Sequence, residues 1–294
     1  MTFPVTGLVP ILATPFAPDG ALAVADLHRL LEFQLACGVD GIALFGFASE
    51  TFALSAHDRE QILDAVDTVV GRAVPVVVGV NATGLPAAVE QAQQAAEHGA
   101  AGLMVLPPYM VKPSPAQLID FYGGLAAQVP VPVMVQDAPN MTGVQMPVPL
   151  LAELAALPGV DAVKVETPPT APKCGAVGRA APGFAVFGGQ NALFLLEEYA
   201  RGAVGTMPAC EFADALRPVL DDWAKGLRDQ AYDGFNRLLP LIRYGLQPGL
   251  AWAIHKHVLV RRGVIATATV RAPAQPVDDV TVAELDAILA ATGL

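Results

Sequence analysis

The feature of this sequence that most restricts its fold is a regular alternation of short apolar runs with longer segments of helical periodicity. The apolar runs cover residues 8–16, 41–46, 74–80, 101–108, 131–136, 160–166, 184–189 and 203–208. Most of them are continuously apolar, as expected for parallel strands that are covered by helices. Eight repeats of a strand followed by a helix predict an α/β protein with the (β/α)₈ TIM barrel fold.

The segments between the apolar runs carry the start and stop signals of helices. Residues 24–38 and 86–99 are amphipathic, and each segment ends in a glycine. Ser55, followed three residues later by Asp58, predicts a helix N-cap with a variant of the capping box. A doubly wound sheet is the competing architecture. However, the first apolar run leads into LATPFAPDG, which lacks the glycine-rich turn of that fold.

The strand and helix repeats end near residue 226. We therefore expect a catalytic barrel over residues 1–226 and a C-terminal helical extension over residues 227–294 that packs on the barrel. The extension contains three segments of helical character and a connection rich in proline and aspartate at residues 272–279. We interpret it as an appendage of the barrel and not as a separate functional domain.

Composition excludes several classes of function. Hydrophobic residues make up 53% of the 294 residues, so the chain can bury a large core. A formal charge of −11 and the lack of a Lys/Arg cluster argue against a nucleic-acid partner. Cys37, Cys174 and Cys210 are widely spaced, which favours a reducing compartment. Without a basic leader or a membrane-length apolar run, we expect a cytoplasmic protein with no membrane partner.

Lys164 is the residue that points most directly to chemistry. It lies in the apolar run VDAVKVE, at the end of the sixth predicted strand, where barrel enzymes place their active sites. A lysine in a buried strand is costly unless it is paired or neutral, and a neutral amine is a nucleophile. The alternative is an edge lysine that reaches solvent. The remaining lysines lie in loop or helix contexts: Lys112, Lys173, Lys225 and Lys256.

Three further features accompany Lys164. Glu166 follows two residues later, so strand periodicity places both side chains on one face. An amine and a carboxylate in one pocket can form an imine and transfer protons, although a structural ion pair explains the spacing equally well. Gln136 and Asp137 end the fifth predicted strand, where Asp137 either takes part in the site or fixes the loop. The loop at residues 46–51 offers backbone N–H groups, as a carboxylate site needs.

No metal site and no separate cofactor are expected. His255 and His257 are two residues apart on a predicted helix and therefore point to different faces. The sequence contains no phosphate-binding loop and no Ser/His/Asp arrangement.

These segments together resemble the dihydrodipicolinate synthase / N-acetylneuraminate lyase family of class I aldolases. The resemblance covers nearly the whole chain and includes GLVPILATPFAPDG, LFGFASETFALSAHDR, LPPYMVKPS, QDAPNMTG and VKVET. It implies a barrel that forms homo-oligomers, usually tetramers, in which Lys164 forms the imine. It also implies that a small 2-oxo acid binds through its carboxylate at Ala48 and Ser49. Gly188 and Met207, near the ends of the last two strands, are further candidate substrate-binding residues.

The departures from the family pattern concern proton transfer and the second substrate. Gln136 stands in place of the tyrosine that acts as general acid and base, and an amide cannot shuttle protons near neutral pH. Phe47 and Ala48 replace the hydroxyl residues of the second loop, and Met110 replaces a second tyrosine. Met141 replaces the arginine that holds the second substrate of the synthases. We therefore expect no dihydrodipicolinate synthase activity.

The segments VPVMVQDAP, KVETP and GTMPACEFADALRP resemble the branch that dehydrates 2-keto-3-deoxy sugar acids such as L-2-keto-3-deoxyarabonate. This resemblance implies a lyase with Lys164 as the Schiff-base residue, Glu166 as the acid/base, and Gln136 and Ser49 as orienting groups. Two alternatives stay open. One is an aldolase that yields pyruvate and an aldehyde, and the other is a 2-oxo-acid-binding barrel without catalytic activity.

Overall fold

The computed structural model describes residues 3–294. Its internal contacts group the chain into two compact units. The first unit holds the N-terminal segment up to Val9 together with Pro75–Met207, and the second holds Pro10–Val74 together with Pro208–Leu294. These units do not follow the expected boundary at residue 226, which stays a prediction.

The first unit is built on a sheet of parallel strands in the order β3-β4-β5-β6-β7-β8-β1. Because neighbours in the sheet follow the order of the chain without a reversal, a doubly wound sheet is excluded. The strands are β1 (Gly7–Leu8), β3 (Val76–Val80), β4 (Gly102–Val105), β5 (Val133–Asp137), β6 (Val160–Val165), β7 (Ala185–Gly188) and β8 (Gly205–Thr206).

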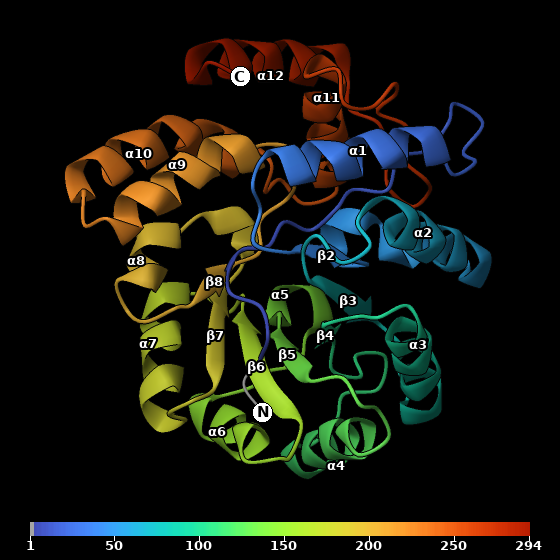
Figure 1. Ribbon diagram of the computed structural model, residues 1–294, viewed down its shortest axis with the longest axis vertical. Coiled ribbons are helices and arrows are strands. Elements are labelled where there is room, and N and C mark those ends of the chain that lie inside the picture. The colour runs from blue at the N-terminus through green and yellow to red at the C-terminus, as the bar shows by residue number, and fades with distance from the viewer. Residues whose placement is uncertain (1–2) are drawn as a thin grey trace. The chain divides into compact units, whose positions relative to one another are not determined.

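Helices alternate with these strands and lie around them in Figure 1. They are α3 (Leu85–Glu97), α4 (Pro115–Ala126), α5 (Pro139–Thr142), α6 (Val148–Ala155), α7 (Thr170–Ala180) and α8 (Leu195–Tyr199). Valine, leucine and methionine fill the strand interiors, while Phe3 packs edge-on against Phe187 at a ring separation of 5.8 Å. The fully buried Tyr122 donates its hydroxyl hydrogen bond to the carbonyl of Val105, so α4 is fixed to β4.

The second unit contains β2 (Ile42–Leu44), two 3₁₀ turns and six helices within the described residues. Ile11 forms parallel bridges to Ala43 in β2 and to Ala209. The helices are α1 (Val24–Ala36), α2 (Ala56–Val69), α9 (Ala213–Ala224), α10 (Arg228–Tyr244), α11 (Ala251–Arg261) and α12 (Asp279–Thr292), and the turns are η1 (Phe47–Ser49) and η2 (Thr51–Ala53).

The predicted cap of α2 is confirmed. The Ser55 side chain accepts a hydrogen bond from the Asp58 N–H, and Asp58 accepts one from the Ser55 N–H. Arg271 makes two further hydrogen bonds to the same carboxylate, and these hold the pKa of Asp58 well below its usual range. The cap therefore also ties α2 to the segment that follows α11.

Eight parallel strands alternating with helices give the chain the (β/α)₈ barrel fold that the apolar runs predicted, with additional C-terminal helices. The first strand is much shorter than the run at residues 8–16, because Pro10 and Pro15 cannot donate to a strand ladder. All three cysteines are free and buried. Among residues 3–294, no helix is long and apolar enough to cross a membrane.

Glu198 on α8 is a buried carboxyl group of the first unit. It is 1% exposed and packs so closely on β7 that a Cβ atom at Gly188 would collide with its Oε2. Among the described residues, neither carboxyl oxygen makes a hydrogen bond of normal geometry, although the Thr170 hydroxyl is close enough to affect it. Burial raises the pKa of Glu198 to about 7; the Thr170 hydroxyl lowers it, and the charges of Glu197 and Glu166 raise it. Below about pH 7 the Glu198 carboxyl group is therefore mostly protonated and neutral.

We predict that this carboxyl group makes the protein less stable as the pH rises. The unfolded carboxyl ionises near pH 4.5, whereas the folded one keeps its proton up to about pH 7, so stability present below pH 4.5 is lost between these values. Between pH 5 and pH 8, the free energy of unfolding should fall by about 2 to 3 kcal/mol more in the parent protein than in Glu198→Gln. Urea denaturation at both pH values measures the difference. Glu153→Gln, an exposed change on α6 of the same unit, is the control, and equal pH slopes for parent and Glu198→Gln would contradict the assignment.

Candidate active site

Lys164 projects from the end of β6 into a largely apolar environment. Its register partners are Gln136 on β5 and Phe187 on β7, so the three side chains lie on the same face of the sheet. Lys164 is 3% exposed. Its Nζ lies 3.3 Å from Oε1 of Glu166, so the spacing of two residues brings the amine and the carboxylate together as predicted. The alternative of a lysine that reaches solvent does not fit this burial.

Gln136 completes the cluster from the neighbouring strand. Its Nε2 donates a hydrogen bond of 2.8 Å to Oε2 of Glu166. The Glu166 carboxylate therefore has Lys164 at one oxygen and the amide of Gln136 at the other. The Oε1 of Gln136 is buried and has no partner within residues 3–294. It remains available to accept a hydrogen bond from a bound molecule.

The backbone of Glu166 is fixed from both sides. Its N–H donates to the carbonyl of Asp137 at 2.9 Å, and its carbonyl accepts a hydrogen bond of 2.7 Å from Nε2 of Gln190. A Cβ atom at Gly189 would collide with Cγ of Glu166, so glycine is required there for the carboxylate to occupy its position. The end of β5 and the turn after β7 together orient this side chain.

Asp137, the residue after Gln136, forms a second polar cluster with Lys173 and Thr167. Its side chain is fully buried, and its Oδ2 lies 2.6 Å from Nζ of Lys173 and accepts a hydrogen bond of 2.7 Å from Thr167. Lys173 also donates to the carbonyl of Met146 at 2.8 Å. Burial raises the pKa of Asp137, and the ammonium group of Lys173 opposes that rise. Asp137 thus ties the end of β5 to Thr167, just after β6, and to Lys173 on α7. Its two predicted roles, in the site or in fixing its own loop, stay predictions.

Ala48 and Ser49 lie in η1, which belongs to the second unit. Ser49 is 2% exposed, and its hydroxyl donates a hydrogen bond of 2.6 Å to the carbonyl of Leu12. Its N–H donates to Gly46, and its carbonyl accepts a hydrogen bond from Thr14. Both donors of Ser49 are therefore already used within this unit. The assignment of Ala48 and Ser49 to a substrate carboxylate stays a prediction.

Gly188 and Met207 occupy the ends of the last two strands. Gly188 pairs with Val165 and therefore faces away from the side of the sheet that carries Lys164. Its carbonyl accepts a hydrogen bond of 3.2 Å from the N–H of Met207, whose side chain is 2% exposed. Substrate contacts from either residue stay predictions, and from Gly188 they are confined to the backbone.

Lys256 is a buried lysine that the sequence interpretation placed among ordinary helix residues. It is fully buried in the second unit, where it forms an ion pair with Glu50 and donates to the carbonyl of Thr269 at 2.7 Å. Burial lowers the pKa of Lys256 to about 8, while the charge of Glu50 opposes the change. The detectable signal was its position inside the apolar helical segment AWAIHKHVLV. Burial alone therefore does not single out Lys164; its position beside Glu166 and Gln136 does.

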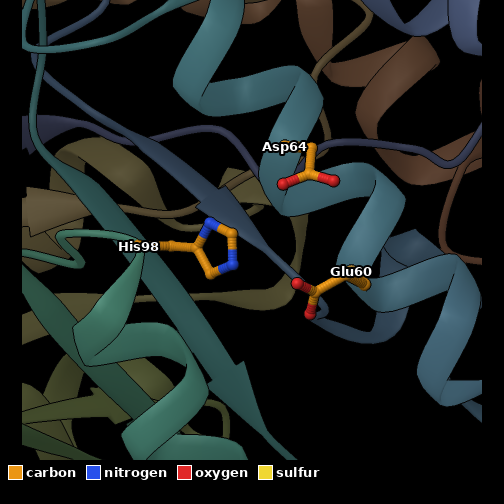
Figure 2. A group of neighbouring side chains, drawn as sticks. All are labelled: Glu60, Asp64 and His98. Atoms are coloured by element: carbon orange, nitrogen blue, oxygen red, sulfur yellow. The ribbon is translucent and has the colours of Figure 1, made fainter.

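Figure 2 shows Glu60 and Asp64 on successive turns of α2, and His98 at the C-terminal end of α3. Both carboxylates are exposed and belong to the second unit, whereas His98 belongs to the first. Within either unit taken by itself, the described residues gather no three side chains of metal-binding type. His255 is engaged instead by Glu211 at 2.6 Å. The expectation that the protein needs no metal stays a prediction.

A barrel in which a buried lysine lies beside a carboxylate at the end of a strand defines a class of enzymes that work through a lysine imine. The chain belongs to the dihydrodipicolinate synthetase family, which it matches over residues 4–292. It is therefore a Schiff-base lyase of that family.

One relative is the L-2-keto-3-deoxyarabonate dehydratase of Azospirillum brasilense, with 33% identity over 290 residues, 96% of this chain and 93% of the relative. The dihydrodipicolinate synthase of Rhodopseudomonas palustris is similar in structure, with a TM-score of 0.92, 28% identity and coverage of 99% of each chain. YagE of E. coli K12, solved in complex with pyruvate, has a TM-score of 0.89 and 25% identity, covering 98% of this chain and 99% of its own.

We predict that Lys173 stabilises the protein mainly by compensating the buried Asp137. Lys173→Met leaves that carboxylate unpaired and should lower the free energy of unfolding by about 3 kcal/mol. Adding Asp137→Asn to Lys173→Met should recover at least about 1 kcal/mol, because the uncompensated charge is then gone. Urea denaturation at pH 7.5 measures both effects. Lys225→Met, at an exposed position, controls for the loss of a lysine. Additive costs for the two changes would show that the pair is not coupled.

Proposed function

We propose that this protein is a dehydratase that holds a 2-keto-3-deoxy sugar acid, such as L-2-keto-3-deoxyarabonate, as a Schiff base on Lys164. The observation that carries the proposal is the contact of Lys164 with Glu166, whose other carboxylate oxygen is held by the amide of Gln136. The similarity to a dehydratase over 96% of the chain supports the same reaction.

The first step is formation of the imine. The neutral amine of Lys164 attacks the C2 carbonyl carbon of the 2-oxo acid, and the resulting carbinolamine loses water to give the iminium ion. Glu166 lies within reach of the reacting nitrogen and is the group that moves protons in this step.

The second step is elimination. The carboxylate of Glu166 removes a proton from C3, and the electron pair of that bond forms the enamine. The lone pair of the enamine nitrogen then re-forms the iminium, the C2=C3 electron pair shifts to make a C3=C4 double bond, and the C4–O bond breaks. The C4–O electron pair leaves with the hydroxide, which takes the proton from Glu166 and departs as water. Proton transfers and hydrolysis of the iminium release the product and restore Lys164.

Gln136 favours dehydration over carbon–carbon cleavage. Retro-aldol cleavage needs a base that takes the proton of the C4 hydroxyl, and an amide side chain cannot accept a proton near neutral pH. The unpaired Oε1 of Gln136 can instead accept a hydrogen bond from a substrate hydroxyl and keep that group in place. In this proposal, Ala48 and Ser49 bind the substrate carboxylate, and Met207 and the backbone of Gly188 line the site.

An aldolase is the second candidate, because Glu166 is also a base placed beside the imine. Product analysis separates the two reactions. A five-carbon 2-keto-3-deoxy acid yields an oxo-acid semialdehyde of unchanged chain length by dehydration, whereas cleavage yields pyruvate and an aldehyde. A binding protein without catalytic activity would yield neither.

We predict that borohydride, added in the presence of pyruvate, reduces a pyruvate imine on Lys164 and leaves the pyruvate carbons covalently attached to that residue. Intact mass should show one adduct for each chain, and peptide mapping should place it on Lys164. Lys164→Arg should give no adduct, because a guanidinium group is not a nucleophile near neutral pH. The buried Lys256 is an internal comparison and should stay unlabelled. Native protein that forms no adduct would refute imine chemistry at this site.

We also predict that Glu166→Gln separates imine formation from elimination. The variant should form the imine more slowly, because Glu166 also moves protons in that step, but it should still reach full trapping on Lys164 at saturating pyruvate. Turnover of 2-keto-3-deoxyarabonate should fall by a factor of about 100 or more, as is typical for loss of a general base. Glu153→Gln, an exposed change on α6, should leave turnover unchanged. Full turnover by Glu166→Gln would remove Glu166 from its assigned role.

A further inference from the structure

One face of α11 carries three polar side chains that reach loops of the second unit. Trp252, His255 and Lys256 are spaced by three and four residues, so they lie on the same side of the helix. Trp252 contacts the carbonyl of Phe47, and His255 contacts Glu211. Lys256 forms an ion pair with Glu50. None of these contacts follows from the interpretation of the extension as a passive appendage.

Trp252 holds the start of the loop that follows β2. Its Nε1 donates a hydrogen bond of 2.6 Å to the carbonyl of Phe47, the residue immediately before Ala48. Its ring also packs edge-on against Phe52 at the other end of this loop, with centroids 4.9 Å apart. The indole thus contacts the loop on both sides of Ala48 and Ser49.

Lys256 holds the residue that follows Ser49. Glu50 is fully buried and adopts the left-handed conformation with φ 53°, which is unfavourable for a residue with a side chain. Its carboxylate forms the ion pair with Lys256 and accepts a hydrogen bond of 2.9 Å from the backbone N–H of Arg271. These contacts keep Glu50 in place and thereby fix the backbone direction at Ser49.

His255 holds a second loop. Its Nδ1 lies 2.6 Å from Oε1 of Glu211, and both side chains are almost fully buried. Glu211 follows β8 by five residues, and its carbonyl also accepts a hydrogen bond from Arg262. The same helix face therefore anchors the loops that follow the second and the eighth strands.

We propose that Trp252, His255 and Lys256 are positioning residues for substrate binding and that Trp252 and Lys256 set the geometry of the Phe47–Glu50 loop. This inference rests on the proposed function, which assigns the substrate carboxylate to Ala48 and Ser49. The C-terminal extension is then a working part of the enzyme, because it shapes a binding loop that lies about 200 residues earlier in the chain.

Trp252→Phe is the informative variant. It removes the hydrogen bond to Phe47 and keeps an aromatic ring against Phe52. Lys256→Met would leave the buried Glu50 without its partner and is expected to destabilise the unit too strongly for a binding measurement. Arg261→Ala is the matched control, since Arg261 also lies on α11 but forms its ion pair with Asp286 on the exposed side, away from the loop.

The probe is pyruvate, trapped on the full-length protein by borohydride over a range of concentrations. We expect the half-saturating concentration to rise about fivefold in Trp252→Phe, which corresponds to the loss of one hydrogen bond. The maximal labelling of Lys164 should stay the same, because the lysine itself is not altered. Arg261→Ala should match the parent protein in both quantities.

The other outcomes overturn the proposal in distinguishable ways. If the parent protein is labelled on Lys164 and Trp252→Phe has the same half-saturating concentration, α11 does not position the loop, while the proposed function stands. If Arg261→Ala shows the same rise as Trp252→Phe, the effect is a general loosening of the extension and the specific role is refuted. If the parent protein is not labelled, the proposed function fails and this inference fails with it.

Discussion

The site depends on the ion pair between Lys164 and Glu166 at the end of a strand whose other side chains are almost all apolar. In such surroundings an unpaired charge is very costly, so each group constrains the position of the other. Gln136 donates to the second carboxylate oxygen, and the backbone of Glu166 is held by Asp137 and Gln190. The carboxylate is therefore held in one orientation by the protein itself, which is the arrangement that lowers the cost of positioning the catalytic base that we propose it to be.

The same rule accounts for the other buried ionisable groups. Asp137 forms an ion pair with Lys173 in the first unit, and Glu50 forms one with Lys256 in the second. Each pair joins segments that are far apart in the chain. Glu198 is the contrasting case, because its carboxyl oxygens make no hydrogen bond of normal geometry within the described residues and its pKa is raised to about 7. A neutral carboxyl group costs less in this position than a charged one, so the proton is retained up to about pH 7. Pairing and protonation are thus two solutions to one electrostatic problem.

The fold and the central pair could be predicted because both are local patterns. Apolar runs mark strands, and a spacing of two residues places Lys164 and Glu166 on one face. The length of the first strand was overestimated, since hydrophobicity does not register the missing N–H groups of Pro10 and Pro15. The contact of Lys256 with Glu50 could not be predicted, because the two residues are 206 positions apart and no periodicity connects them. The contact between Gln136 and Glu166 also needs the register of two strands, which the sequence does not encode locally.

In the proposed function, Gln136 stands where the family resemblance implies a tyrosine, and this difference sets the direction of the reaction. A phenol and an amide both form hydrogen bonds, but only the phenol can give up and regain a proton at moderate cost. In that proposal, Glu166, which contacts both Gln136 and Lys164, is the proton carrier at the imine, and its carboxylate removes the C3 proton and returns it to the departing oxygen. Elimination needs this single shuttle, whereas carbon–carbon cleavage also needs a base at the C4 hydroxyl. One substitution on β5 can therefore direct the same lysine imine from cleavage to loss of water.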